Sequence, residues 1–106
     1  MTATVDLQTF VSRHADGVRV IDVREPAEYV GGHVPGAELT PMSRLWMYVA
    51  QLPRDEDVYV ICESGNRSRS MTDVLAAQGI RAISVEGGTA AWRAAGCPVV
   101  TGAHAA

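Results

Sequence analysis

The sequence has 106 residues, of which 47% are hydrophobic and 20% charged, and its formal net charge is −3. This length suits one compact domain with a core of its own and leaves no room for two. The mildly acidic balance argues against a nucleic-acid or membrane-surface partner, since both favour an excess of basic residues. Residues 1–106 are therefore expected to form a single domain.

Two cysteines, Cys62 and Cys97, stand in quite different contexts, which argues against a disulfide framework. No N-terminal segment joins basic residues to an apolar run as a secretion signal does. No apolar run approaches the ~18 residues that a membrane span needs. We expect a cytoplasmic protein that has no membrane partner and is a monomer or a weak dimer.

The first half of the chain alternates between strand-like and helix-like patterns. A short edge strand is expected at residues 4–5. Residues 6–15 have the i, i+3, i+4 apolar spacing of an amphipathic helix, with Asp6 as its cap. The β-branched run at residues 18–23 predicts a buried strand. Three more elements are expected before the midpoint: one or two helical turns at 26–30, a short strand at 37–39, and a helix from Ser43 to Leu52 that Pro53 ends.

The second half continues the alternation. Residues 58–61 form an apolar strand pattern, and a helix is expected from near Ser68 to Gly79. A strand within residues 80–85 ends at a pair of glycines, and a last helix contains Trp92. Residues 101–106 have no core-forming pattern and are expected to be a flexible tail.

Strands that alternate with helices predict an α/β fold of three layers. Crossover connections of this kind join parallel strands and place helices on both faces of one sheet. We expect a mostly parallel sheet of about five strands. Such sheets bind ligands at the carboxyl ends of their strands, which is where Cys62 is expected.

The stretch from Val58 to Ser70 carries the clearest sign of chemistry. A strand delivers Cys62 to a short polar loop, and a helix follows. Backbone amides of such a loop, together with the helix N-terminus, converge on one point. A thiol among these dipoles ionises more readily, because they stabilise the anion. Cys62 as an ordinary buried core cysteine is the alternative, but the polar loop with Gly65 directly after it favours the functional reading.

The loop Cys62-Glu63-Ser64-Gly65-Asn66-Arg67-Ser68 resembles the active-site loop of the rhodanese family, sulfurtransferases that carry sulfur as a cysteine persulfide. Two other segments are similar to the same family. One is Ile21-Asp22-Val23-Arg24-Glu25, continuing through Glu28-Tyr29 to Gly32-His33-Val34-Pro35-Gly36-Ala37. The other is Val85-Glu86-Gly87-Gly88, with Ala91-Trp92 and Gly96-Cys97-Pro98-Val99. The resemblance runs from about Leu7 to Val100.

The resemblance implies a rhodanese-like fold and a mechanism in two steps. Cys62 takes the outer sulfur of thiosulfate or of a persulfide, and a thiol, a redoxin or cyanide then removes it. Residues 63–68, which are Glu63, Ser64, Gly65, Asn66, Arg67 and Ser68, would form the persulfide cradle. Ser68 would donate a hydrogen bond to the sulfur or cap the helix. Asp22 and Arg24 would support the loop, and no metal or organic cofactor is implied.

Loop length separates this activity from that of phosphatases and arsenate reductases on the same fold. Those relatives have five residues between the cysteine and an arginine that grips a tetrahedral oxyanion. Here four residues lie between Cys62 and Arg67. The shorter loop suits one sulfur atom better than a phosphate. Two other functions share the fold: a non-catalytic regulatory module, and a relay that passes persulfide between proteins.

Glu63 departs from the family pattern, which tends to have a basic residue near this position. A carboxylate ~6 Å from a dianion costs about 3 kcal/mol per unit charge at an effective dielectric near 20. Arg67 and Arg69 are expected to oppose this repulsion. Thiosulfate is therefore expected to be a poor donor.

The remaining polar candidates favour structural roles. Arg24 and Glu28 are expected to pair across one helical turn, and His33 to stabilise a turn. Cys97 is expected to be a packed, inert thiol, with a resolving or relay thiol as the alternative. Trp46 is expected to pack in the core or to border the mouth of the pocket.

Overall fold

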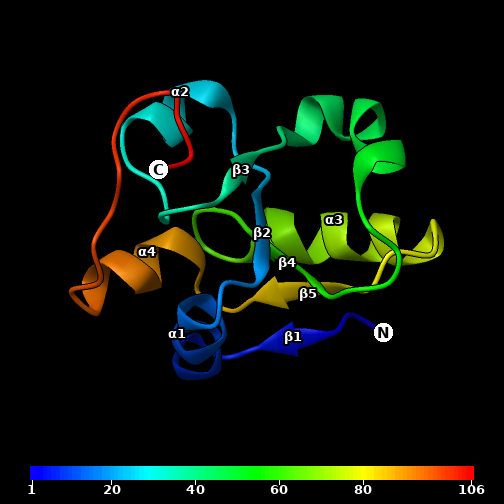
Figure 1. Ribbon diagram of the computed structural model, residues 1–106, viewed down its shortest axis with the longest axis horizontal. Helices are drawn as coiled ribbons and strands as arrows, with labels where there is room; N and C mark the ends of the chain where they lie inside the picture. The colour runs from blue at the N-terminus through cyan, green and yellow to red at the C-terminus, as the bar shows by residue number, and fades with distance from the viewer.

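The computed structural model describes residues 1–106 and contains one five-stranded sheet in which all neighbouring strands are parallel. The strand order is β1-β5-β4-β2-β3, so β4 is central (Figure 1). The strands are β1 (Thr4–Val5), β2 (Arg19–Asp22), β3 (Glu38–Leu39), β4 (Val58–Ile61) and β5 (Ala82–Val85). The predicted α/β architecture is confirmed.

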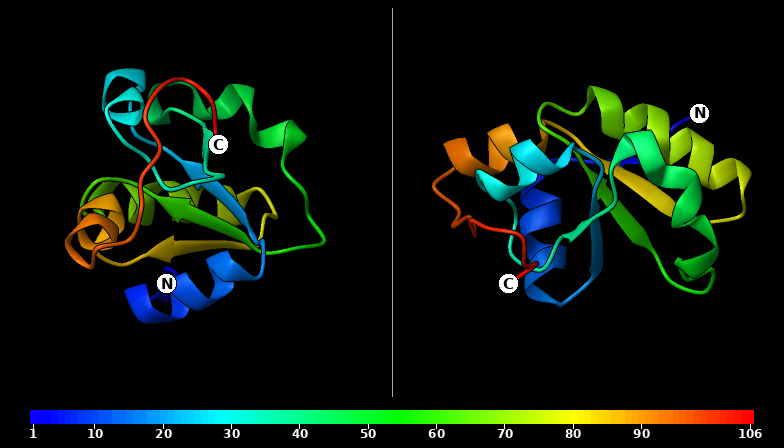
Figure 2. Two further views of the ribbon diagram at one scale, coloured as in Figure 1. Left: turned by 60° about the vertical axis from the view of Figure 1, so that its left-hand side comes forward. Right: turned by 90° about the horizontal axis from the view of Figure 1, so that it is seen from above.

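Helices cover both faces of this sheet. They are α1 (Leu7–Ala15), α2 (Pro26–Val30), α3 (Asn66–Ala77) and α4 (Gly88–Ala94). In the right-hand view of Figure 2, α1 and α4 lie on one side of the strands and α3 on the other. None of the helices combines the length and the hydropathy that crossing a membrane requires.

The core consists of two apolar clusters, one on each face of the sheet, because successive side chains of a strand point to opposite faces. Val58 and Val60 of β4 belong to the cluster under α3, and Tyr59 and Ile61 belong to the cluster under α1 and α4. All four residues of β4 are buried. The strand that leads to Cys62 is therefore held from both sides.

The segment expected to be an α-helix from Ser43 to Leu52 is instead two 3₁₀ segments, η1 (Met42–Met47) and η2 (Val49–Gln51). Arg44 has non-helical dihedral angles inside η1. A helix of this size depends on the packing of one apolar stripe. Here only Leu45 and Leu52 are buried, while Trp46 is 78% exposed. The segment therefore lacks the side-chain packing that would stabilise an α-helix over a 3₁₀ turn.

The C-terminal residues 101–106, expected to be a loose tail, make specific contacts beside α2 (Figure 1). Gly102 N donates to the carbonyl of Val30, and Gly36 N donates to that of Ala105. The ring Nε2 of His33 lies 2.8 Å from the carbonyl of His104. Sequence pattern does not reveal these contacts, because each of them uses a backbone group of the tail.

Candidate active site

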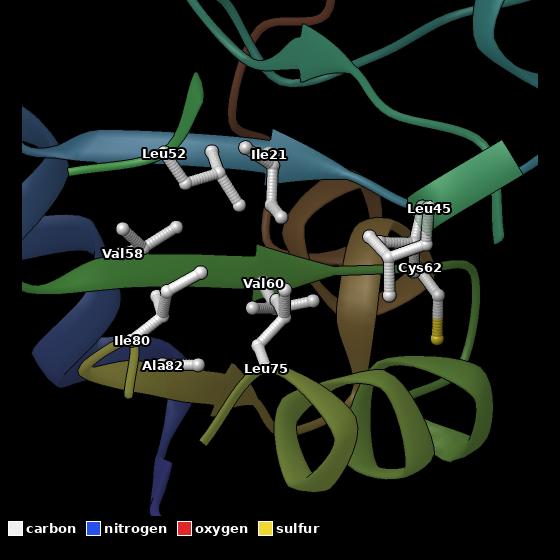
Figure 3. Close-up of a cluster of buried hydrophobic side chains, with 10 residues drawn as sticks. Ile21, Leu45, Leu52, Val58, Val60, Cys62, Leu75, Ile80 and Ala82 are labelled. Atoms are coloured by element: carbon white, nitrogen blue, oxygen red, sulfur yellow. The ribbon is translucent and has the colours of Figure 1, made fainter. Parts of the chain in front are cut away.

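Cys62 follows the last residue of β4, at the carboxyl edge of the sheet. Its side chain points toward the beginning of α3 (Figure 3). The residue is fully buried and belongs to the apolar cluster that also contains Leu45 and Leu75. One side of the thiol therefore faces the core, and the other faces the loop.

Two backbone amides of the loop converge on the sulfur. Gly65 N donates to Cys62 Sγ at 3.1 Å, and Ser68 N donates at 3.3 Å. Gly65 has a φ of +105°, in the left-handed region that glycine adopts without strain. Both amides precede or open α3, so their dipoles favour negative charge at this point.

The hydroxyl of Ser68 lies near the sulfur together with these two amides. Its Oγ is 3.5 Å from Cys62 Sγ and 2.8 Å from the Oγ of Ser84, and it also contacts the carbonyl of Gly65. Gly65 occupies the N-cap position of α3 and Ser68 lies inside the helix. The helix thus begins two residues before the position expected from the sequence, and Ser68 is not its cap.

The turn into α4 holds the first residues of the loop, a role that sequence reasoning missed. Thr89 donates to the carbonyl of Cys62 from its N at 2.8 Å and from its Oγ1 at 3.0 Å. Ala90 N donates to the carbonyl of Glu63. A Cβ on Gly88 would lie 2.5 Å from the Cys62 carbonyl oxygen, so only glycine permits this approach. The two adjacent glycines, Gly87 and Gly88, were the available signal.

Glu63 lies between two guanidinium groups. Its carboxylate is 3.0 Å from Arg24 Nη1 and 3.3 Å from Arg93 Nη1. These partners replace Arg67 and Arg69, which were expected to oppose its charge. Arg93 was not among the sequence candidates, because it lies thirty positions away in α4.

Arg24 is a buried cation that ties three segments together. Its guanidinium donates to Asp22, to Glu63 and to the carbonyl of Gly32. Burial disfavours its charge, but the hydrogen bond to Asp22 and the nearby carboxylates outweigh burial and raise the pKa of Arg24. Asp22 is itself fully buried and accepts from the backbone N of Arg24. The expected supporting pair therefore reaches the loop through Glu63.

Glu28 pairs with Arg67 and not, as expected, with Arg24. Arg67 Nη1 and Nη2 each donate to a carboxylate oxygen of Glu28 at 2.7 Å. These hydrogen bonds lower the pKa of Glu28 to about 2 and raise the pKa of Arg67. The prediction that Arg24 pairs with Glu28 was wrong, because the side chain of Arg24 turns inward to Asp22. Glu28 of α2 thus holds the guanidinium of Arg67, which makes no hydrogen bond to the thiol of Cys62.

The model of the rhodanese-like domain family matches residues 7–95. The chain belongs to this family. It is 35% identical over 103 residues to a sulfurtransferase of Allochromatium vinosum, covering 94% of this chain and 96% of that protein. It is 29% identical to the thiosulfate sulfurtransferase GlpE of Pseudoalteromonas translucida, covering 83% of this chain and 85% of that one.

The solved structure of a rhodanese-related protein from Thermoplasma volcanium has the same fold. Its TM-score against this chain is 0.84 at 33% identity, covering 92% of this chain and 97% of that one. The similarity in structure thus extends over nearly the whole rhodanese-like domain.

Other candidates lie apart from the thiol of this rhodanese-like domain. His33 is fully buried, stacks on Tyr29 with ring centroids 3.6 Å apart, and has both ring nitrogens against backbone carbonyls. It therefore connects backbone segments, as expected of a turn-stabilising residue. Cys97 packs against the cluster on the face opposite to Cys62. Ser64 and Asn66 of the loop are exposed.

Proposed function

We propose that this domain transfers a sulfane sulfur through a persulfide on Cys62. The observation that carries the proposal is the pair of amide hydrogen bonds from Gly65 and Ser68 to Cys62 Sγ. Donors that are already aimed at the sulfur stabilise a thiolate, and then a persulfide anion, with little reorganisation. The rhodanese-like family and its sulfurtransferase-named members support the same activity.

In the first step the Cys62 thiolate attacks the outer sulfur of the donor. With thiosulfate, a new S–S bond forms on Cys62, and the bond between the two thiosulfate sulfurs breaks with its electron pair on sulfite. The products are Cys62–S–S⁻ and sulfite, and total charge is conserved. The name of the Pseudoalteromonas relative makes thiosulfate the first donor to test.

In the second step a thiophilic acceptor attacks the outer sulfur of the persulfide. With cyanide the products are thiocyanate and the Cys62 thiolate. With a thiol, a redoxin or another protein thiol, the product is the acceptor's persulfide. The electron pair of the broken S–S bond returns to Cys62 in each case, so no external oxidant or reductant is needed.

Access to the sulfur requires a movement of the protein. Cys62 has no exposed surface, so an outer sulfur reaches Sγ only when the loop at residues 63–67 or the side chains above it shift. A relay shares the chemistry described here and differs from it in the size of the acceptor.

Phosphatase chemistry has less support. An arginine that grips an oxyanion turns its guanidinium toward the nucleophile, and the Nη atoms of Arg67 are instead turned to Glu28. The test is to measure thiocyanate formation from thiosulfate and cyanide beside aryl-phosphate hydrolysis, using the intact chain and Cys62→Ser. Thiocyanate formed by the intact chain alone supports sulfur transfer. Phosphate release without thiocyanate would overturn it.

A further inference from the structure

An open apolar groove lies between α3 and the 3₁₀ segments. Its volume is about 630 Å³, and its apolar lining includes Met42, Leu45, Trp46, Val49, Met71 and Val74. Trp46 is 78% exposed and Val74 is 45% exposed. An exposed tryptophan beside methionines is typical of surfaces that bind a partner, because these side chains supply large and adaptable contact area.

The groove is continuous with the apolar surroundings of Cys62. Leu45 lines the groove and belongs to the buried cluster that contains Cys62, which Figure 3 draws. Met71 of α3 lines the groove and packs against the same cluster. A group seated in the groove therefore contacts side chains of the apolar cluster to which Cys62 belongs.

The charge of the lining is positive. Arg54 is its one ionisable residue, and no carboxylate lines the groove, although the whole chain has a formal charge of −3. Arg54 donates to the backbone carbonyl of Gln78 and has no carboxylate partner. The guanidinium therefore remains available to a negative group on whatever docks there.

Small hydrophilic sulfur compounds such as thiosulfate have no apolar surface to place in such a groove. We propose that the groove docks a protein that receives the sulfur from Cys62, by means of an apolar side chain near its reactive thiol and a carboxylate farther from it. The carboxylate must be farther away because Arg54 contacts Gln78, which lies about 15 Å along α3 from Ser68, the residue beside Cys62 Sγ. This inference rests on the proposed sulfurtransferase function and names the class of its acceptor. The apolar side chain would contact Trp46 and Val74, and the carboxylate would pair with Arg54.

The transfer step balances without another reactant. The acceptor thiolate attacks the outer sulfur of Cys62–S–S⁻, and a bond forms between the acceptor sulfur and that outer sulfur. The S–S bond on Cys62 breaks, and its electron pair leaves on the Cys62 thiolate. The transferred sulfur keeps its negative charge, so the acceptor carries R–S–S⁻ and total charge is conserved.

The experiment uses synthetic peptide thiols as acceptors for the intact chain, loaded with sulfur from thiosulfate or a small persulfide. Four peptides, each with one cysteine, combine either leucine or serine beside the cysteine with either aspartate or lysine five residues away, a separation that an extended chain spans with about 16 Å. Mass spectrometry follows the loss of sulfur from the protein in a single turnover. The leucine–aspartate peptide is expected to react about tenfold faster than the serine–lysine peptide, after correction for the thiolate fraction.

Groove variants separate docking from chemistry. Trp46→Ala and Val74→Ser are expected to remove most of the preference for leucine. Val11→Ser changes a valine of α1 on the other face that is 37% exposed, against 45% for Val74, and is expected to keep the preference. Arg54→Glu is expected to reverse the preference from aspartate to lysine. Loading from the small donor should be unchanged in all four variants, which also shows that they fold.

Two results would count against different claims. Equal rates for all four peptides, or a leucine preference that survives Trp46→Ala, would overturn the docking site while leaving sulfur transfer intact. A chain that accepts no sulfur from thiosulfate or a persulfide would overturn the proposed function itself, before any peptide is added.

Discussion

Glu28 in α2 and Arg67 in the first turn of α3 form a two-point ion pair, with both hydrogen bonds at 2.7 Å. The pair joins two elements that lie 39 residues apart in the sequence. It fixes the outer edge of the loop whose amides bind the sulfur. Through this contact α2 influences the site without touching the thiol.

The ion pair predicts a dependence of stability on pH. The folded-state pKa of Glu28 is lowered from 4.5 to about 2, so its contribution is present above about pH 4.5 and is lost as the pH falls toward 2. Both side chains are about one-third exposed, which limits the contribution to about 1 kcal/mol. Urea unfolding of the intact chain and of Glu28→Gln should differ by this amount at pH 6 and converge near pH 2. A difference that stays constant over this range would contradict the pairing.

Glu63 should determine how well the domain uses thiosulfate. The Glu63 carboxylate forms ion pairs with Arg24 and Arg93. Glu63→Lys removes its negative charge and leaves the guanidinium of Arg93 available to an anionic donor. We expect the KM for thiosulfate to fall several-fold, because charge near the loop governs the approach of a dianion. Steady-state kinetics of thiocyanate formation measures this.

Two controls accompany the Glu63 prediction. Glu63→Gln removes the charge without adding a cation, and should give an intermediate KM. Glu56→Gln changes an exposed carboxylate that precedes β4, at the far end of that strand from Cys62, and should leave the KM unchanged. An unchanged or raised KM in Glu63→Lys would show that this carboxylate does not repel the donor.

Gly88 should tolerate no side chain. Its φ is +59°, and an added Cβ would lie within 2.7 Å of backbone atoms of Cys62 and Glu63. Gly88→Ala is expected to cost more than about 2 kcal/mol of unfolding free energy and to lower the rate of sulfur loading. Gly17→Ala is the matched control, because Gly17 has a φ of +78° with nothing within 4 Å of its Cβ position.

The two glycine variants differ only in crowding. Gly17→Ala carries the left-handed strain alone, about 1 kcal/mol, and should load sulfur at the normal rate. Denaturation by urea gives the two free energies. Equal losses in both variants would mean that the close approach of α4 to Cys62 is unimportant.

The sequence predicted the parts of this molecule that local patterns encode. The strand at residues 58–61 is continuous in apolar residues, and Gly65 follows Cys62 in a polar loop, so both the sheet edge and the cradle could be expected. Local patterns could not predict which charged side chains would pair with one another. Whether Arg24 meets Glu28 or Glu63 depends on which way its side chain turns, and a buried Asp22 two residues before it decides that.

Contacts between segments that are distant in the sequence could not be predicted from local patterns either. Arg93 and the Gly88–Thr89 turn reach the loop only because β5 lies beside β4 and places α4 against Cys62. The 3₁₀ segments were missed for a different reason. Their apolar spacing matches a helix, but most of their large side chains remain exposed and cannot stabilise one.

The most direct test of the account is the intact mass of the protein after incubation with thiosulfate or a small persulfide, followed by peptide mapping of the modified residue. The account predicts a gain of one sulfur atom, mapped to Cys62, abolished in Cys62→Ser and retained in Cys97→Ser. A folded chain that gains no sulfur from either donor, or that gains it on Cys97, would contradict the central role of the thiol at the end of β4.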